Sequence, residues 1–311
     1  MRRRTSAIAG LLATATASLT LLTGCTADGT STAGTPAGAA GPARDRERAL
    51  TRTEQARLDE AEQRLVQRCM ARQDFPYWIF PRVSADTERA FSDDFVQDDV
   101  AWAREHGYGG RLKKAFFAEK KRDRNLAYRE SLSPDARERY ITALSGGPDT
   151  PVRSVKLPAG GTVRTMLGGC ELTARKELYG DVEAFFRADK IATNLSGLYS
   201  PQLMRDKRYT AGVSAWSSCM KKETGRAYAT PDAARADAEE RTGGLSDERA
   251  HAVEVGLAVA EATCAQETSL AGTLAALDRE YGDPVRKRYG EEVATADSMR
   301  LAALERADRA S

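Results

Sequence analysis

Five cysteines are the residues of this sequence whose number and spacing first suggest chemistry. Cys25 closes the quartet LTGC at residues 22–25, and the others are Cys69, Cys170, Cys219 and Cys264. No two of the last four lie closer than 45 positions, whereas zinc sites favour close pairs such as C-x2-C. A cysteine nucleophile needs a histidine partner, and the chain has only His106 and His251. We therefore expect structural disulfides, with a metal site, a free thiol or a catalytic thiolate as the alternatives.

Four cysteines allow three disulfide pairings, and their spacing does not choose among them. A weak internal repeat favours one pairing, because two Cys-Met pairs each lie near the end of a helical pattern and precede an aromatic loop. Cys69-Met70 is followed downstream by Cys170, and Cys219-Met220 by Cys264. The repeat thus favours Cys69–Cys170 and Cys219–Cys264, each stabilising the fold by about 4–5 kcal/mol at most. It also suggests two similar halves, the first with an insertion between Pro81 and roughly Val163.

Basic side chains are concentrated between residues 111 and 130, with leucine, phenylalanine and tyrosine among them. If this segment is helical, it forms an amphipathic basic surface. Such a surface can contact anionic lipid headgroups or the anionic polymers of a cell wall, and a solvated outer face is the alternative. The candidate anion contacts are Lys113, Lys114, Lys120, Lys121, Arg122 and Arg124.

Acidic side chains provide two weaker candidates. Four aspartates fall within residues 93–99, but they lack the D-x-D-x-D-G order of a calcium loop. We expect Asp98 or Asp99 to cap a helix instead. Asp74 lies beside Phe75-Pro76-Tyr77-Trp78, and apolar neighbours raise the pKa of a carboxyl group. Because a carboxylate pair for glycoside cleavage is defined by its separation in space, a hydrolase remains an alternative function.

The familiar catalytic motifs are missing from the sequence. The segment HGYGG at residues 106–110 is similar to the HGGG loop of esterases, but Tyr108 interrupts it and the chain has no G-x-S-x-G elbow. There is no P-loop and no H-E-x-x-H. We expect the HGYGG segment to end a helix, and we expect no catalytic residue, no metal ligand and no cofactor.

Residues 1–24 have the order of a secretory leader, with basic Met1–Arg4, an apolar stretch through Leu22 and small residues before Cys25. The quartet LTGC resembles a bacterial lipobox, in which the cysteine receives a diacylglyceryl group and becomes the new N-terminus. The acyl chains, palmitate among them, then anchor the protein in the membrane. Residues 25–44 are small and lack an apolar period, so they predict a tether. The remaining 45–311 form the extracytoplasmic domain.

Net charge argues against nucleic acid as a partner. Lys and Arg number 47 against 45 Asp and Glu, and because Arg2, Arg3 and Arg4 precede the expected cleavage site, the mature chain has 44 and a net charge of −1. Nucleic-acid binding relies on an excess of basic side chains. We therefore expect no nucleic-acid partner.

Helical patterns cover most of residues 45–311 and must position these side chains. Apolar spacing and capping residues predict helices over 45–73, 98–105, 133–146, 169–179, 181–195, 209–224, 230–242, 246–281 and 283–307, with a short turn at 200–201. A β-hairpin is predicted from 152–157 and 162–165. The sequence therefore predicts a mainly α, disulfide-stapled domain of two similar halves, about 45–197 and 198–311, with one small hairpin insertion.

Short motifs along the domain also resemble a family. They are NLAY at 125–128, SLSP at 131–134, GGC at 168–170, WSSC at 216–219 and YATP at 228–231. Together they are similar to segments of secreted lipoproteins of Streptomyces-type actinomycetes, over most of residues 65–281. The resemblance implies an exported protein with disulfides, and it implies no particular activity.

These observations favour a membrane-anchored extracytoplasmic lipoprotein that acts by binding. Its expected partners are the membrane through the lipid anchor, and another envelope protein or the cell wall. A wall-active hydrolase is the alternative, and an open groove lined by Trp78, Trp102 or Trp216 with two facing acids would favour it.

Overall fold

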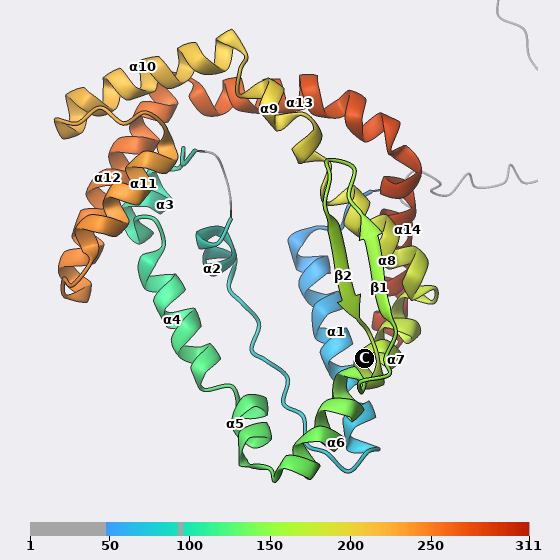
Figure 1. Cartoon of the computed structure of the whole chain (residues 1–311). Helices are drawn as coiled ribbons and strands as arrows, with labels where there is room; N and C mark the ends of the chain where they lie inside the picture. Colours follow the sequence, from blue (N-terminus) through green and yellow to red (C-terminus); the bar gives the residue numbers. More distant parts are fainter. Residues whose placement is uncertain (1–47, 93–95, 311) are drawn as a thin grey trace, which may run out of the picture. The chain divides into compact units, whose positions relative to one another are not determined.

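The structure, a computed structural model, describes residues 48–92 and 96–310, so the leader, Cys25 and the tether lie outside the described residues. Helices dominate the described part (Figure 1), and the mainly α prediction is confirmed. The helices are α1 (Arg52–Ala71), α2 (Ala85–Ala90), α3 (Val100–His106), α4 (Gly110–Lys121), α5 (Arg124–Ser131), α6 (Pro134–Ser145), α7 (Gly169–Tyr179), α8 (Val182–Ala192), α9 (Ser200–Leu203), α10 (Lys207–Thr224), α11 (Pro231–Thr242), α12 (Asp247–Glu267), α13 (Leu270–Arg288) and α14 (Gly290–Ala310), with the 3-10 turn η2 (Ser196–Leu198). The strands are β1 (Val152–Lys156) and β2 (Thr162–Met166).

Local capping residues set most of the predicted helix ends. Asp99 caps α3, and Gly107, with φ of 62°, ends it. Ser133 caps α6 and Thr230 caps α11, each with a proline at the start of the helix. Each cap is a bond between residues about three positions apart, so the sequence pattern is sufficient to locate it.

The single helix expected over 246–281 is wrong, because the chain breaks there into α12 and α13. The Thr268 hydroxyl donates to the Cys264 carbonyl at 2.7 Å at the end of α12. The next residue, Ser269, has φ of 54° in the left-handed region and turns the chain into α13. Pro284, expected near the start of a new helix, instead lies inside α13, which continues to Arg288.

The predicted hairpin is confirmed, and it packs on α8. Strands β1 and β2 pair antiparallel, with Val155 opposite Val163. Val155 is buried in an apolar cluster with Phe186 and Ile191 of α8. The hairpin therefore has one covered face, which fixes its register.

Two large apolar clusters form the core, and each holds a disulfide cysteine pair. The first, which we call the α1 cluster, joins side chains of α1, α6 and α7 to Ala303 and Ala307 of α14. The second, the α12 cluster, joins α10, α11, α12 and α13, and Val96 and Tyr108 pack against it. Contacts join the two predicted halves, because α14 packs on α7 and α8, and α3 packs on α12. The boundary near residue 197 stays a prediction.

Within the described residues, no helix combines the length and apolar character that crossing a bilayer requires.

Candidate binding site

Glu261, in the middle of α12, is the centre of a buried polar network in the α12 cluster. Its side chain is 0% exposed. One carboxylate oxygen accepts the Gln97 N–H at 2.8 Å and an Arg235 guanidinium N–H at 3.1 Å. The other accepts the Tyr108 O–H at 2.8 Å. Donors that lie 26, 153 and 164 positions from Glu261 in the chain thus converge on one carboxylate.

The electrostatics of this network follow from its burial. Removal from water raises the pKa of Glu261, although Arg235 and the hydrogen bonds from Gln97 and Tyr108 oppose that rise. Burial is also the main reason that the pKa of Tyr108 is raised well above its usual range, with Glu261 adding to it. Tyr108 therefore keeps its proton and acts as a hydrogen-bond donor to Glu261.

A cavity of about 150 Å³ lies beside this network. Arg89 is held in its wall by Asp99 at 2.8 Å and by the Gln97 side-chain oxygen at 2.9 Å, and its guanidinium lies 4.9 Å from the Trp102 ring centroid. These contacts fix the orientation of Arg89 before any ligand enters. The lining also includes Tyr108, Lys113, Arg235, Glu239 and Glu254.

Two further charged residues of the lining, Glu254 and Lys113, differ in their partners. Glu254 of α12 accepts the Gly110 N–H at 2.9 Å, which satisfies one of the unpaired N–H groups at the start of α4. A Cβ at Gly110 would lie 2.0 Å from a Glu254 oxygen, so a larger residue there would displace the Glu254 carboxylate. Lys113, which also lines the cavity, makes no ion pair or side-chain hydrogen bond within the described part of the chain. Lys113 is therefore the lining cation that a ligand can engage.

The HGYGG segment ends α3, as predicted, and it also leads directly into α4. Gly107 ends α3 with φ of 62°, and Gly109 precedes α4 with φ of 81°. A Cβ at Gly107 would lie 2.7 Å from the Glu254 Cβ. The glycines thus allow the turn to approach α12 closely, and this places Tyr108 against Glu261.

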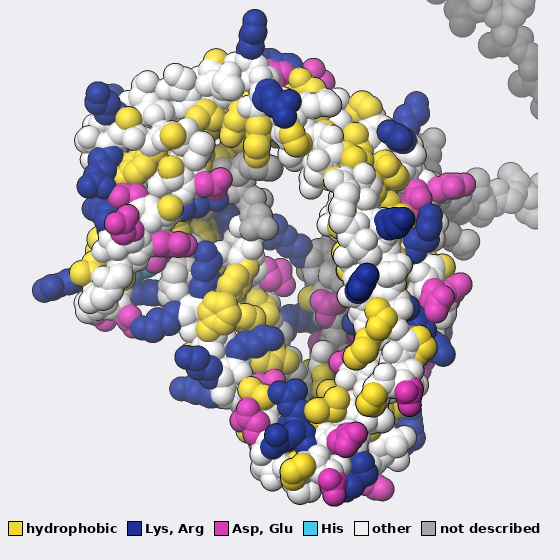
Figure 2. Space-filling model, in the orientation of Figure 1, with side chains coloured by type: hydrophobic (Ala, Val, Ile, Leu, Met, Phe, Trp, Pro, Cys, Tyr) yellow, Lys and Arg dark blue, Asp and Glu magenta, His cyan; other side chains and the backbone are white. Residues whose placement is uncertain are grey.

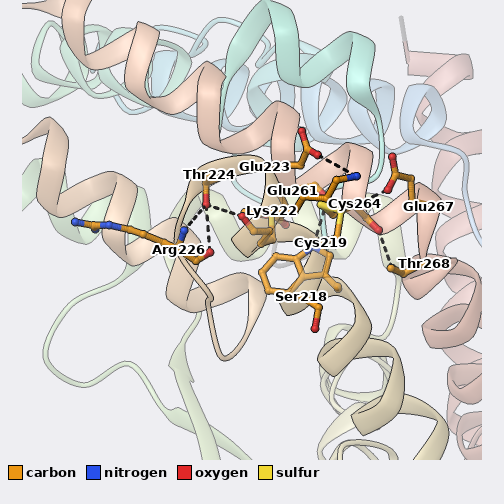
Figure 3. Close-up of a disulfide and its surroundings, with 12 residues drawn as sticks. Ser218, Cys219, Lys222, Glu223, Thr224, Arg226, Glu261, Cys264, Glu267 and Thr268 are labelled. Atoms are coloured by element: carbon orange, nitrogen blue, oxygen red, sulfur yellow. Dashed lines mark hydrogen bonds and ion pairs between the residues drawn. A yellow bond between two sulfur atoms is a disulfide. The ribbon is translucent and has the colours of Figure 1, made fainter.

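The four domain cysteines form the two disulfides that the repeat favours. Cys69–Cys170 joins α1 to α7, and Cys219–Cys264 joins α10 to α12. Figure 3 shows the second bond with Glu267, whose carboxylate oxygen lies 3.6 Å from the Cys219 sulfur. Glu261 lies on the same helix as Cys264, so this disulfide also fixes α12, which carries the network. Cys25 lies outside the described residues.

The six predicted anion contacts lie in different surroundings along α4 and the start of α5. Lys113 lines the cavity. Its neighbour Lys114 is exposed and pairs with Asp247 at 2.5 Å. Lys120 lies over the Phe80 and Phe116 rings, and Arg124 lies over Trp78. Lys121 and Arg122 are exposed at the end of α4.

The predicted acidic and aromatic candidates are placed as follows. Asp99 caps α3 and pairs with Arg89, and no group of three metal-ligating side chains occurs among the described residues. Asp93 and Asp94 lie outside the described residues. Trp216 is fully buried, and Trp102 lines the cavity. The aromatic segment at residues 75–80 is largely half-buried, for example by the edge contact of Trp78 with Tyr128.

Sequence reasoning missed Glu261. Its one local signal is that it is the only charged residue in the run LAVAEATCA at 257–265. A lone acid within an apolar stretch of helix indicates a buried carboxylate that needs partners. The identity of those partners, which lie 26 to 164 positions away, has no local signal.

Comparison of the chain with protein-family models, with curated proteins and with solved structures finds no match. The resemblance to actinomycete lipoproteins therefore stays a prediction from the short motifs.

Proposed function

We propose that this protein is a lipid-anchored lipoprotein of the extracytoplasmic membrane face, and that it acts by binding a small anionic solute in the cavity beside Glu261. The LTGC quartet at residues 22–25 supports the anchor. The two disulfides support an oxidising compartment, where such bonds persist. The observation that carries the binding function is the cavity itself, with its fixed charged lining.

The pairing of the three cations in the lining favours an anionic ligand. Arg89 has Asp99 as its partner, and Arg235 has Glu261. Lys113 lacks such a partner among the described residues, so a carboxylate or phosphate group of a ligand would complete its pairing. The volume of about 150 Å³ is below the roughly 300–1,000 Å³ of pockets for drug-sized ligands. We infer a solute of a few heavy atoms with one anionic group.

A wall-active hydrolase is the second candidate function. The specific observation in its favour is that Trp102 lines the same cavity as two acids, Glu239 and Glu254. The carboxylate of Glu254 is already bound to the Gly110 N–H. A glycan segment also exceeds the volume of this cavity, so binding of a small solute fits the geometry better.

Thermal unfolding with small anions tests the binding function. Phosphate, acetate and glutamate serve as probes, because a ligand that binds only the folded state raises its stability. At one hundred times its Kd, a probe adds about 2.7 kcal/mol, or roughly 5–10 °C in Tm for a domain of this size. We expect at least one of these probes to raise the Tm of the natural protein by this amount.

Two neighbouring lysines provide the matched variants. Lys113→Ala removes the cavity cation, and we expect it to abolish the shift caused by the probe. Lys114→Ala removes an exposed cation that faces Asp247, and we expect the shift to persist. Equal shifts in both variants, or no shift with any probe, would exclude an anion site at Lys113.

The anchor and the hydrolase alternative have separate tests. In cells, Cys25→Ala should move the protein from the membrane fraction to the soluble fraction and abolish labelling with palmitate. Persistence of the variant in the membrane fraction would contradict the anchor. Incubation of purified cell wall with the protein should release no sugar fragments, and their release would favour the hydrolase. Crosslinking in cells would identify an envelope protein as partner.

A further inference from the structure

Four phenylalanines form a continuous aromatic patch on the surface around α4. Phe91 and Phe116 have ring centroids 5.0 Å apart, and both lie within 6 Å of Phe117. Phe80 extends the patch, 6.4 Å from Phe116. The Phe117 side chain is 55% exposed and Phe91 is 40% exposed. Large apolar side chains that cluster on a surface mark a contact with something outside the molecule.

Basic side chains surround the most exposed of these rings. Phe117 has a lysine three and four positions before it and three and four positions after it, which on a helix places all four beside it. They are Lys113, Lys114, Lys120 and Lys121. Arg122 and Arg124 follow at the end of α4 and the start of α5, and both are exposed. Figure 2 shows hydrophobic and basic side chains side by side in the region of α4.

The acidic side chains of this region reduce its charge without cancelling it. Glu119, Asp123 and Glu130 lie within the same stretch of the chain, and Asp247 pairs with Lys114. Lys120, Lys121 and Arg122 are exposed and make no ion pair among the described residues. The aromatic patch therefore lies beside a net positive surface.

We propose that this face of α4 lies on the surface of an anionic lipid bilayer, with Phe117 and Phe91 at the depth of the headgroups and the lysines on anionic lipid. A short helix with phenylalanine on one face and lysine around it has the character of an interfacial helix. Anionic lipid complements the charge of this surface. A solvated face favours polar side chains over exposed rings such as Phe91 and Phe117, and a dissolved polyanion would not use the phenylalanines. The proposal depends on the proposed function only because the anchor keeps the domain near a membrane.

Sedimentation with vesicles tests this contact without the anchor. The chain beginning at Thr26, without lipid, contains all of the compact unit Pro42–Ser311. We expect it to sediment with phosphatidylglycerol vesicles and to remain in solution with phosphatidylcholine vesicles. Failure to bind phosphatidylglycerol would overturn the contact. The anchor and the anion cavity would be unaffected, since each has its own test.

Matched variants assign the contact to α4. Phe117→Ser should weaken binding to the anionic vesicles at least tenfold, whereas Met166→Ser, which removes another apolar side chain that is 51% exposed, should leave it unchanged. Lys120→Glu with Lys121→Glu should abolish binding. The control is the double variant Lys221→Glu with Lys222→Glu. Its two lysines lie in the last turn of α10, as Lys120 and Lys121 lie in the last turn of α4.

Two outcomes would overturn the bilayer contact even if the chain binds the vesicles. Unchanged binding of Phe117→Ser, together with loss in the Lys120 and Lys121 variant, would show a purely electrostatic contact with polyanions. Equal loss in both double-lysine variants would show that overall charge, and not this face, attracts the protein. Equal Tm values of variants and natural chain establish that the changes leave the fold intact.

Discussion

At the scale of the residue, the buried carboxylate of Glu261 depends on donors from three other segments. An isolated buried carboxylate is costly, and each donor reduces that cost. Gln97 supplies a backbone N–H, Tyr108 an O–H and Arg235 a charged N–H. Loss of one donor leaves the carboxylate less satisfied, so the network is sensitive to single substitutions.

Substitution of Tyr108 tests this sensitivity. Tyr108→Phe removes the O–H donor to a buried carboxylate, and we expect a loss of about 1–3 kcal/mol in the free energy of unfolding. Tyr281→Phe is the matched control, because it removes a bond of the same kind to Asp206 nearer the surface. We expect a smaller loss there. Urea unfolding measures the loss in free energy of unfolding for each variant. An equal loss in the two variants would contradict a special role for burial.

The candidate site could be predicted from the sequence only in part. The HGYGG turn, the Asp99 cap and Lys113 were all identified, because each has a local pattern or belongs to a charged run. The hydrogen bonds of Gln97 and Tyr108 to Glu261 were not identified, because bonds over more than a hundred positions follow from helix packing, which no short pattern encodes. Helix packing also decides which of the six basic residues line the cavity and which lie on the outer surface, and the sequence did not predict this division.

At the scale of the element, α1 begins with a reciprocal capping box. The Thr51 hydroxyl accepts the Glu54 N–H at 3.2 Å, and the Glu54 carboxylate accepts the Thr51 N–H at 2.8 Å. Arg48 donates two further hydrogen bonds to Glu54. These contacts, that of Arg48 foremost, lower the pKa of Glu54 from 4.5 to about 2.

The capping box predicts a dependence of stability on pH. Because the folded state lowers this pKa, ionised Glu54 stabilises the protein fully above pH 4.5, and the contribution disappears as the pH falls through about 2. Glu54→Gln keeps a hydrogen-bond acceptor but loses the charge. We expect the Tm of the natural chain to exceed that of the variant at pH 6, and the difference to vanish near pH 2. A constant difference across that range would exclude titration of Glu54 as its cause.

The break between α12 and α13 depends on the left-handed conformation of Ser269. Ser269→Val should lower the free energy of unfolding by about 1–2 kcal/mol, because a β-branched residue is strained at positive φ. Ser269→Gly should retain or raise stability, since glycine adopts this conformation freely. Thermal unfolding distinguishes them, and equal Tm values would contradict strain at this position.

Predictability differs between helix ends and helix breaks. Helix ends that carry a Ser-Pro, Thr-Pro or glycine signal were predicted closely, as at Ser133, Thr230 and Gly180. The break at Ser269 was missed because serine rarely adopts positive φ, so the sequence there favours a continued helix. Pro284 was expected to begin a helix, yet it lies inside α13, which continues to Arg288.

At the scale of the whole molecule, each large apolar cluster contains one disulfide. Cys69–Cys170 closes 101 positions and Cys219–Cys264 closes 45. By the loop-entropy relation, the two bonds contribute about 4.7 and about 4.0 kcal/mol at most. We expect the variant Cys69→Ala with Cys170→Ala to lose more stability than Cys219→Ala with Cys264→Ala, in urea unfolding. The reverse order would show that local contacts outweigh the length of the closed loop.

The position of α14 has a consequence for how the protein is made. Ala303 and Ala307 complete the α1 cluster, and Arg306 donates to the Leu178 carbonyl. Because α1, α7 and α8 precede α14 in the chain, their apolar faces stay uncovered during synthesis and export until α14 has followed them. A chain that stops short of residue 303 keeps those faces open to proteases. The α1 cluster is therefore complete only in chains that include α14.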